Sequence, residues 1–304
     1  MKTIDAIDLC CGGGGWAVAA RGLGINIVAA VDLWRPACMT YQINNPRTTV
    51  INGDLRDAAL QRRVIDDYSG KVQLILGGIP CEWLSIRRNV GNGVGDEELE
   101  QQRATLNSVL DLVAAIGPQW YCLEDVKGLA KELPAGTPWI EIDAAAYSPQ
   151  RRKRIYVGNF PRPTGVGPLL EPESKEVLKD RLRAGPFRIG ARSHGREFVT
   201  SNAFSPDKAY VAPVEGKSPT ICTLTSRHDP EFLVYDERLP GGVRQLEWQE
   251  AARLQGFPED YMFFGSPTDV GTQIGRAVQI DTARVILSGI AKEAGCLSSD
   301  GVMQ

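Results

Sequence analysis

Short apolar runs alternate with helical patterns through the first half of the chain. Runs typical of buried strands lie at 4–9, 25–31, 50–52, 73–76, 120–123 and 155–157. Helical patterns follow at 16–22 and 97–116, and the longer one ends at Gly117-Pro118. Its apolar positions, Leu106, Val109, Leu110 and Val113, recur at helical spacing. Strands that alternate with helices predict parallel βαβ units, so we expect an α/β fold with a doubly wound, Rossmann-like sheet.

The pattern changes after residue 158. From 159 to 216 prolines, glycines and scattered basic residues dominate, and only 175–182 has a weak helical pattern. Helical patterns return at 249–255 and at 272–294, which we interpret as two helices that pack back on the first domain. We therefore predict a first domain at 1–158, a small irregular region at 159–216, and a return to the first domain at 217–304.

Composition excludes several classes of protein. The 304 residues are 43% apolar and 23% charged, as in an ordinary globular protein. The chain has no amino-terminal signal region and no apolar run of about 20 residues, and its seven cysteines form no short-spaced framework. We expect a cytoplasmic monomer without a membrane span. The two histidines, His194 and His228, lack metal-ligand spacing with cysteine, so we predict no metal site.

A glycine-rich segment follows the first predicted strand. Asp8-Leu9-Cys10-Cys11 leads into four consecutive glycines, 12–15, and then a helical pattern. Glycines at this place allow a ligand to approach the backbone. Asp32 ends the second predicted strand and Asp54 follows the third, and both would face the same crevice of a doubly wound sheet. These features predict a nucleotide-like cofactor, since each acid alone would equally fit a turn cap.

The strand at 73–76 leads to Pro80-Cys81, which places a thiol on a stiff turn at a sheet edge. A lone cysteine is more often a small buried hydrophobe. Here an acid, Glu124, follows the next strand, and the basic run Gln150-Arg151-Arg152-Lys153-Arg154 lies beyond it. Instead of a catalytic role, Glu124 could form a structural ion pair, and the basic run could lie on the solvated surface. We favour a catalytic role for Cys81 and Glu124 as a pair.

Taken together, these motifs resemble those of the DNA cytosine carbon-5 methyltransferase family, which uses S-adenosylmethionine. The resemblance also covers four segments of characteristic sequence and order: Glu124-Asp125-Val126, Ser218-Pro219-Thr220-Ile221, Arg253-Leu254-Gln255-Gly256-Phe257-Pro258 and Gln273-Ile274-Gly275-Arg276-Ala277-Val278. The region 159–216 lies where the family has its target-recognition domain, although it is compact for that role.

The resemblance implies specific roles. Cys81 would attack carbon 6 of a cytosine flipped out of double-stranded DNA, and Glu124 would protonate ring nitrogen 3. Arg154 would bind near the carbonyl oxygen, and Arg152 would orient Glu124 or the loop. The residues implied in binding the methyl donor are Asp8, Cys11, Gly12, Gly13, Gly15, Asp32, Leu33, Asp54, Leu55, Arg276 and Ala277.

Three residues depart from the family pattern. Glu82 follows the nucleophile where the family has Gln, and Asp125 and Arg276 each stand where it has Asn. Repulsion from the added carboxylates would hinder formation of the Cys81 thiolate and help Glu124 to keep its proton. A guanidinium near a sulfonium needs an anion beside it. Either Glu82 or Asp125 pairs with Arg276 and ordinary methyl transfer continues, which we favour, or the donor is carboxy-S-adenosylmethionine and the product 5-carboxymethylcytosine.

Two other classes of protein fit parts of the pattern. A transfer-RNA cytosine methyltransferase would share the catalytic set, and the compact region 159–216 leaves that open. A non-catalytic DNA-binding homologue would keep the fold, but it would have no need of both Cys81 and Glu124.

Overall fold

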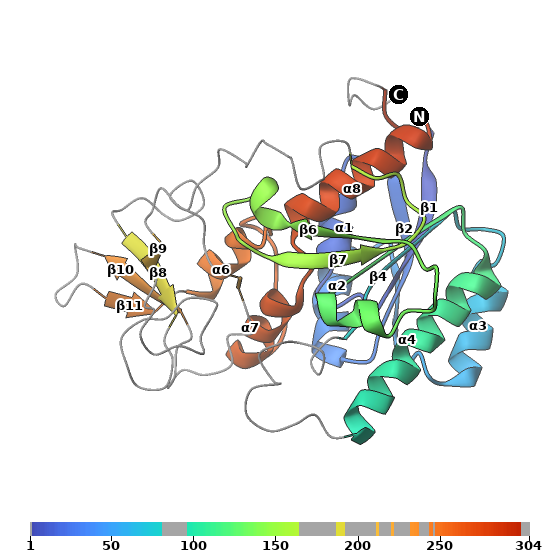
Figure 1. Cartoon of the computed structure of the whole chain (residues 1–304), viewed down its shortest axis with the longest axis horizontal. Helices are drawn as coiled ribbons and strands as arrows, with labels where there is room; N and C mark the ends of the chain where they lie inside the picture. Colours follow the sequence, from blue (N-terminus) through green and yellow to red (C-terminus); the bar gives the residue numbers. More distant parts are fainter. Residues whose placement is uncertain are drawn as a thin grey trace. The chain divides into compact units, whose positions relative to one another are not determined.

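A computed structural model describes residues 2–80, 96–163, 187–191, 211–212, 220–221, 232–236, 243–245 and 247–298 (Figure 1). The chain divides into two compact units. The first contains 1–142, 153–166 and 283–304, and the second contains 143–152 and 167–282. Cys81, Glu82 and the helical pattern at 175–182 lie outside the described residues. The expected domain boundaries at 158 and 216 stay a prediction.

The first unit is built on a seven-stranded sheet of order β3-β2-β1-β4-β5-β7-β6. The strands are β1 (Ile4–Leu9), β2 (Ile25–Asp32), β3 (Thr49–Asn52), β4 (Leu74–Gly78), β5 (Trp120–Asp125), β6 (Trp139–Asp143) and β7 (Lys153–Val157). The pairs among β1 to β5 are parallel, and β7 is antiparallel to β5. The predicted doubly wound α/β sheet is therefore confirmed. Because strand order reverses between β1 and β4, their carboxyl ends flank the place where such sheets bind ligands.

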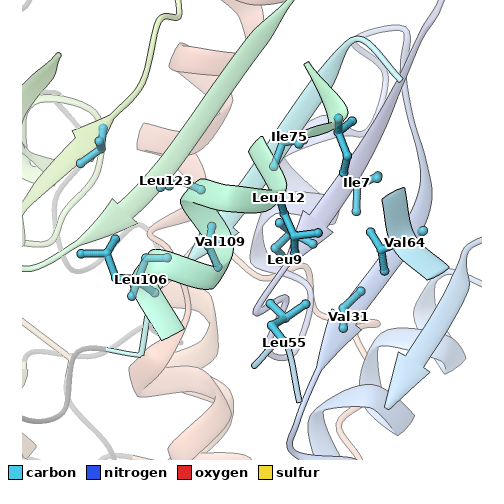
Figure 2. Close-up of a cluster of buried hydrophobic side chains, with 14 of the residues drawn as sticks. Ile7, Leu9, Val31, Leu55, Val64, Ile75, Leu106, Val109, Leu112 and Leu123 are labelled. Atoms are coloured by element: carbon cyan, nitrogen blue, oxygen red, sulfur yellow. The ribbon is translucent and has the colours of Figure 1, made fainter. Parts of the chain in front are cut away.

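One face of the sheet is covered by α3 (Ala58–Tyr68) and α4 (Asp96–Ile116). Figure 2 shows Leu106, Val109 and Leu112 of α4 directed toward Leu9 and other apolar side chains of the sheet. The two predicted core positions Leu106 and Val109 are fully buried, while Leu110 and Val113 pack at the edge of this core. Burial of each such side chain contributes about 1.5–3 kcal/mol, which fixes the sheet beneath the loops.

The opposite face is covered by α1 (Gly15–Ala20), α2 (Arg35–Asn44) and the later part of α8 (Ile280–Glu293). Trp16 of α1 makes an edge-on ring contact with Tyr156 of β7, at 6.4 Å between centroids. The hydroxyl of Tyr41 in α2 donates to Asp8 of β1 at 3.1 Å. Arg284 of α8 donates to the carbonyl of Arg21 at 2.8 Å. The residues from 283 onward therefore pack on the sheet-bearing unit, whereas 249–255 and the first part of 272–294 belong to the second unit.

The second unit contains a four-stranded sheet of order β11-β10-β8-β9. Its antiparallel strands are β8 (Phe187–Ala191), β9 (Val211–Ala212), β10 (Phe232–Asp236) and β11 (Val243–Gln245). Two of them come from the region that had no periodicity in the sequence. A two-residue strand and a five-residue strand that contains Gly190 are too short to show alternation.

The predicted helix at 272–294 is wrong as one element, because the structure has two. Helix α7 (Pro267–Arg276) begins at the capping residue Ser266 and ends at Ala277, whose backbone is extended at φ −59° and ψ 145°. Helix α8 then starts at Ile280. Helix α6 (Trp248–Leu254) precedes both and agrees with the predicted 249–255. Strand β6 has no counterpart in the sequence prediction, since its five residues include Glu141 and Asp143 and show no clean alternation.

Candidate active site

The glycine loop follows β1 at the switch point of the sheet. The amide of Cys11 donates to the carbonyl of Val31 at 3.0 Å, so the loop continues the contact between β1 and β2. Gly14 has φ +92°, a left-handed conformation that favours glycine, and it forms the cap of α1. Space remains open above Gly12, where an added Cβ would meet no atom within 4 Å. The loop therefore leaves room for a ligand.

Asp32, at the end of β2, holds this loop. One carboxylate oxygen accepts from the Gly12 amide at 2.8 Å, and the other accepts from the Trp34 amide at 2.8 Å. The Asn52 side chain donates to the backbone carbonyls of Asp32 and Leu33 at 3.0 and 2.8 Å. Leu33 is 62% exposed although it is apolar, which leaves a hydrophobic surface at the carboxyl end of β2.

Two further acids lie near the loop. Asp8 is fully buried in β1, and burial raises its pKa well above the ordinary value, against the lowering effect of the Tyr41 hydroxyl. One of its carboxylate oxygens has no hydrogen-bond partner. Asp54 lies after β3 and pairs with Arg56 at 2.6 Å, and this bond lowers the pKa of Asp54. Leu55 beside it is buried.

Several carboxylates lie near the two thiols of the glycine loop. Desolvation, followed by repulsion from Asp32 and Asp8, raises the pKa of both Cys10 and Cys11 well above its ordinary value. Asp54 and Asp125 add to the effect at Cys10. Both thiols are therefore held in the protonated form beside the glycine loop.

Glu124 lies at the end of β5, opposite Gly78 of β4 and Tyr156 of β7. Its side chain is nearly buried and forms an ion pair with Arg154 at 3.1 Å, from Nε to Oε1. The amide of Ile79, at the root of the loop that continues to Pro80-Cys81, donates to the Glu124 backbone carbonyl at 3.2 Å. The structure therefore brings Glu124, Arg154 and the start of the Pro80-Cys81 loop together at one sheet edge.

Asp125, the departure from the family pattern, is 1% exposed at the end of β5. Its carboxylate accepts from the Val126 amide. Because Asp125 also contributes to the raised pKa of Cys10, its charge acts on the strand end that carries the glycine loop.

Arg152 and Arg276 belong to the second unit. Arg152 is 3% exposed and donates to the backbone carbonyls of Ile221, Gly275 and Ala277 at 2.9, 3.1 and 3.1 Å. It thus binds the segment that carries Arg276, and its predicted role in orienting Glu124 or the loop stays a prediction. Arg276 itself is exposed, while Ala277 is buried.

Two buried glutamines, Gln150 and Gln255, also belong to this part of the second unit. Sequence reasoning assigned them no role, although both lie within motifs that it singled out. In the sequence, each is a glutamine within an otherwise apolar or basic motif. That pattern indicates a structural role only once the side chain is known to be buried, because buried polar groups need hydrogen-bond partners.

The described residues contain no group of three or more potential metal ligands and no helix long and apolar enough to cross a membrane. The sheet order, with β7 antiparallel beside β5, is that of the methyltransferase fold. A solved structure described as a prophage-encoded DNA modification methyltransferase of E. coli shares the fold, with a TM-score of 0.63, 19% identity and coverage of 95% of this chain and 98% of the other.

The chain belongs to the C-5 cytosine-specific DNA methylase family, whose model matches residues 4–134 and 187–292. The type II methyltransferase M.HindV of Haemophilus influenzae is 27% identical over 94% of this chain and 96% of its own length. M.HgiDI of Herpetosiphon aurantiacus is 28% identical over 93% and 92%. The protein is thus a DNA cytosine carbon-5 methyltransferase that uses S-adenosylmethionine, as the resemblance predicted.

Proposed function

We propose that Cys81, Glu124 and Arg154 carry the chemistry and that the glycine loop with Asp8, Asp32 and Asp54 binds the donor. The observation that carries this proposal is the Glu124–Arg154 ion pair beside the root of the Pro80-Cys81 loop. A buried carboxyl and a guanidinium at the end of one strand, one hydrogen bond from the loop that leads to the thiol, supply the groups that cytosine activation needs.

In the proposed reaction the Cys81 thiolate adds to carbon 6 of the flipped base, and the electron pair of the 5,6 double bond moves to carbon 5. Glu124 gives a proton to nitrogen 3, and Arg154 binds the negative carbonyl oxygen. S-adenosylmethionine supplies a methyl carbon on a sulfonium, which leaves as a neutral thioether. Carbon 5 takes the methyl group and then loses its proton to water. The returning electron pair restores the double bond and expels the Cys81 thiolate, and nitrogen 3 gives its proton back to Glu124, which leaves neutral 5-methylcytosine.

A suicide substrate tests this assignment. Duplex DNA with 5-fluorocytosine in its target sites carries fluorine in place of the departing proton, so the adduct cannot be resolved. We expect a covalent protein–DNA complex on denaturing gels with the wild type and none with Cys81→Ser. Cys296→Ala is the matched control, since Cys296 is a fully buried thiol of the carboxyl-terminal segment. An adduct that persists in Cys81→Ser contradicts the assignment.

A second candidate concerns the donor. Arg276 is the only exposed residue between Val270 and Ile280, on a backbone held by Arg152, and a fixed guanidinium is suited to bind a carboxylate. With carboxy-S-adenosylmethionine, carbon 5 would take a carboxymethyl group and the same neutral thioether would leave. The acids around the glycine loop favour a cationic donor instead, and for this reason we place methyl transfer first.

The two donors are compared by incubating the enzyme and duplex DNA with each one and identifying the modified nucleoside by mass. Exclusive 5-methylcytosine supports methyl transfer, and 5-carboxymethylcytosine supports the second candidate. Arg276→Asn should then lose activity with the carboxylated donor selectively, whereas equal loss with both donors indicates a structural ion pair. We also propose a cytoplasmic monomer that acts on double-stranded DNA, which size-exclusion chromatography and competition with RNA would test.

A further inference from the structure

A cluster of three buried polar side chains lies in the second unit. Gln150 and Gln255 are 0% exposed and Arg152 is 3% exposed. We call these three residues the carbonyl clamp, because most of their hydrogen bonds end on backbone carbonyl oxygens. Such groups are costly to bury, so a cluster of three requires a reason beyond the filling of space.

Arg152 divides its donors between two segments. Its Nη2 donates to the carbonyls of Gly275 and Ala277, both at 3.1 Å, and thus bridges the carbonyl groups of the two residues on either side of Arg276. Its Nη1 donates to the carbonyl of Ile221 at 2.9 Å. The fixed fork of a guanidinium can hold several acceptors at set angles, which the single ammonium of a lysine cannot.

Gln255 binds the same helix end from a second direction. Its Nε2 donates to the carbonyls of Ile274 and Ala277 at 2.7 and 3.3 Å. Its Oε1 accepts from Gln150 at 3.0 Å, while the Oε1 of Gln150 accepts from the Ile221 amide at 3.2 Å. Because each amide oxygen has a donor, the orientation of both glutamine side chains is defined.

The clamp thus captures the carbonyls of residues 274, 275 and 277 at the end of α7. These are acceptors that a helix end leaves without partners, and a cation there also complements the helix dipole. With Ala277 turned to an extended conformation, the chain leaves the helix immediately after Arg276. The outcome is one exposed side chain on a backbone fixed on both sides.

We propose that Arg152 and Gln255 are positioning residues that set the direction of Arg276 and, through it, the affinity for the donor. The inference rests on the proposed placement of Arg276 among the donor-binding residues. A clamp that served only to end α7 would stabilise the fold without any dependence on the side chain at 276, and this difference is measurable.

A double-mutant cycle separates the two roles. The dissociation constant of S-adenosylmethionine is measured by calorimetry for the wild type, Gln255→Met, Arg276→Asn and the double variant. In the wild-type background we expect Gln255→Met to change the dissociation constant of S-adenosylmethionine by about tenfold, because the substitution removes buried hydrogen bonds. In the Arg276→Asn background the same change should fall to about twofold or less.

Gln279→Met is the matched control. Gln279 is equally buried and lies three residues beyond Arg276, but its Oε1 accepts from the amide and hydroxyl of Thr282 at the start of α8. We expect this variant to lower the melting temperature with little effect on donor affinity. An equal effect of Gln255→Met in both backgrounds, or an effect on affinity that Gln279→Met reproduces, overturns the inference.

Arg152→Lys serves if Gln255→Met does not fold, because it keeps a buried cation while losing the bridge across Arg276. We expect its effect on the donor dissociation constant to depend on the side chain at 276 in the same way. A wild-type protein that modifies cytosine but shows no such coupling contradicts the clamp alone. A wild-type protein that binds no donor contradicts the donor assignment, and the inference falls with it.

Discussion

Arg152 and Arg154 lie two residues apart in one basic run, yet their guanidinium groups have different kinds of partner. Arg154 in the first unit pairs with the carboxylate of Glu124, and its side chain is 15% exposed. Arg152 in the second unit donates to three neutral carbonyls and is 3% exposed. An arginine that pairs with a carboxylate at the edge of a sheet is placed to take part in chemistry. An arginine that donates to buried backbone carbonyls instead fixes the conformation of the backbone. A shared motif therefore does not imply a shared role.

The largest expected effect is on catalysis by Arg154. Arg154→Met removes the cation beside Glu124 and should lower kcat by about 10²–10³-fold, the range found when one preorganised charge-stabilising group is lost. Because the side chain is partly exposed, we expect only a small fall in the melting temperature. Steady-state methylation of duplex DNA and a thermal melt measure the two quantities. A large loss of stability with little loss of kcat would mean that Arg154, like Arg152, has a structural role.

A smaller effect, on stability, is expected for the neighbouring arginine. Arg152→Met removes a donor from three buried carbonyls, of which Ala277 keeps its bond from Gln255 at 3.3 Å. A buried carbonyl left without a donor costs about 1–3 kcal/mol, reduced where water enters. Denaturant unfolding should show a clear loss of stability. Arg151→Met is the control, since Arg151 is exposed in the same run. If Arg152→Met unfolds like the control, its carbonyl bonds contribute little.

The smallest effect concerns pH. The folded-state pKa of Asp8 is raised by burial, so ionisation costs stability as pH rises from the unfolded-state value toward the folded-state one, and the cost persists above both. Below the unfolded-state pKa both states are protonated and the cost vanishes. Asp8→Asn should therefore raise the melting temperature at pH 7 and leave it unchanged near pH 3. A gain of equal size at both pH values would mean that charge is not the cause.

The sequence predicted most of the first unit because its signals are local. The apolar runs of β1, β2 and β5 and the helical spacing of α4 are continuous, and each was located to within a few residues. Asp32 and Glu124 were found because parallel strands bring their carboxyl ends to one edge. Strand β6 and the break between α7 and α8 were missed for the opposite reason. The break at Ala277 depends on Gln255 and Arg152, which reach it from distant positions of the chain.

In the candidate site, too, local sequence signals could be interpreted and long-range contacts could not. The pattern could propose Arg154 and Arg152 together, but no spacing rule distinguishes a side chain that faces a carboxylate from one that faces carbonyls. That distinction depends on which unit each residue joins when the chain folds. The boundary between the two units falls between Arg152, the last residue of a segment of the second unit, and Lys153, where the chain enters the first unit again.

The thiols beside the acidic glycine loop have a practical consequence. Alkylating reagents react with the thiolate, and the pKa of every described cysteine is raised, to about 11 for Cys38 and well above the ordinary value for Cys10, Cys11 and Cys122. At neutral pH, iodoacetamide should spare these side chains in the folded protein. A fluorophore or spin label could then be attached at another thiol without first removing these five cysteines.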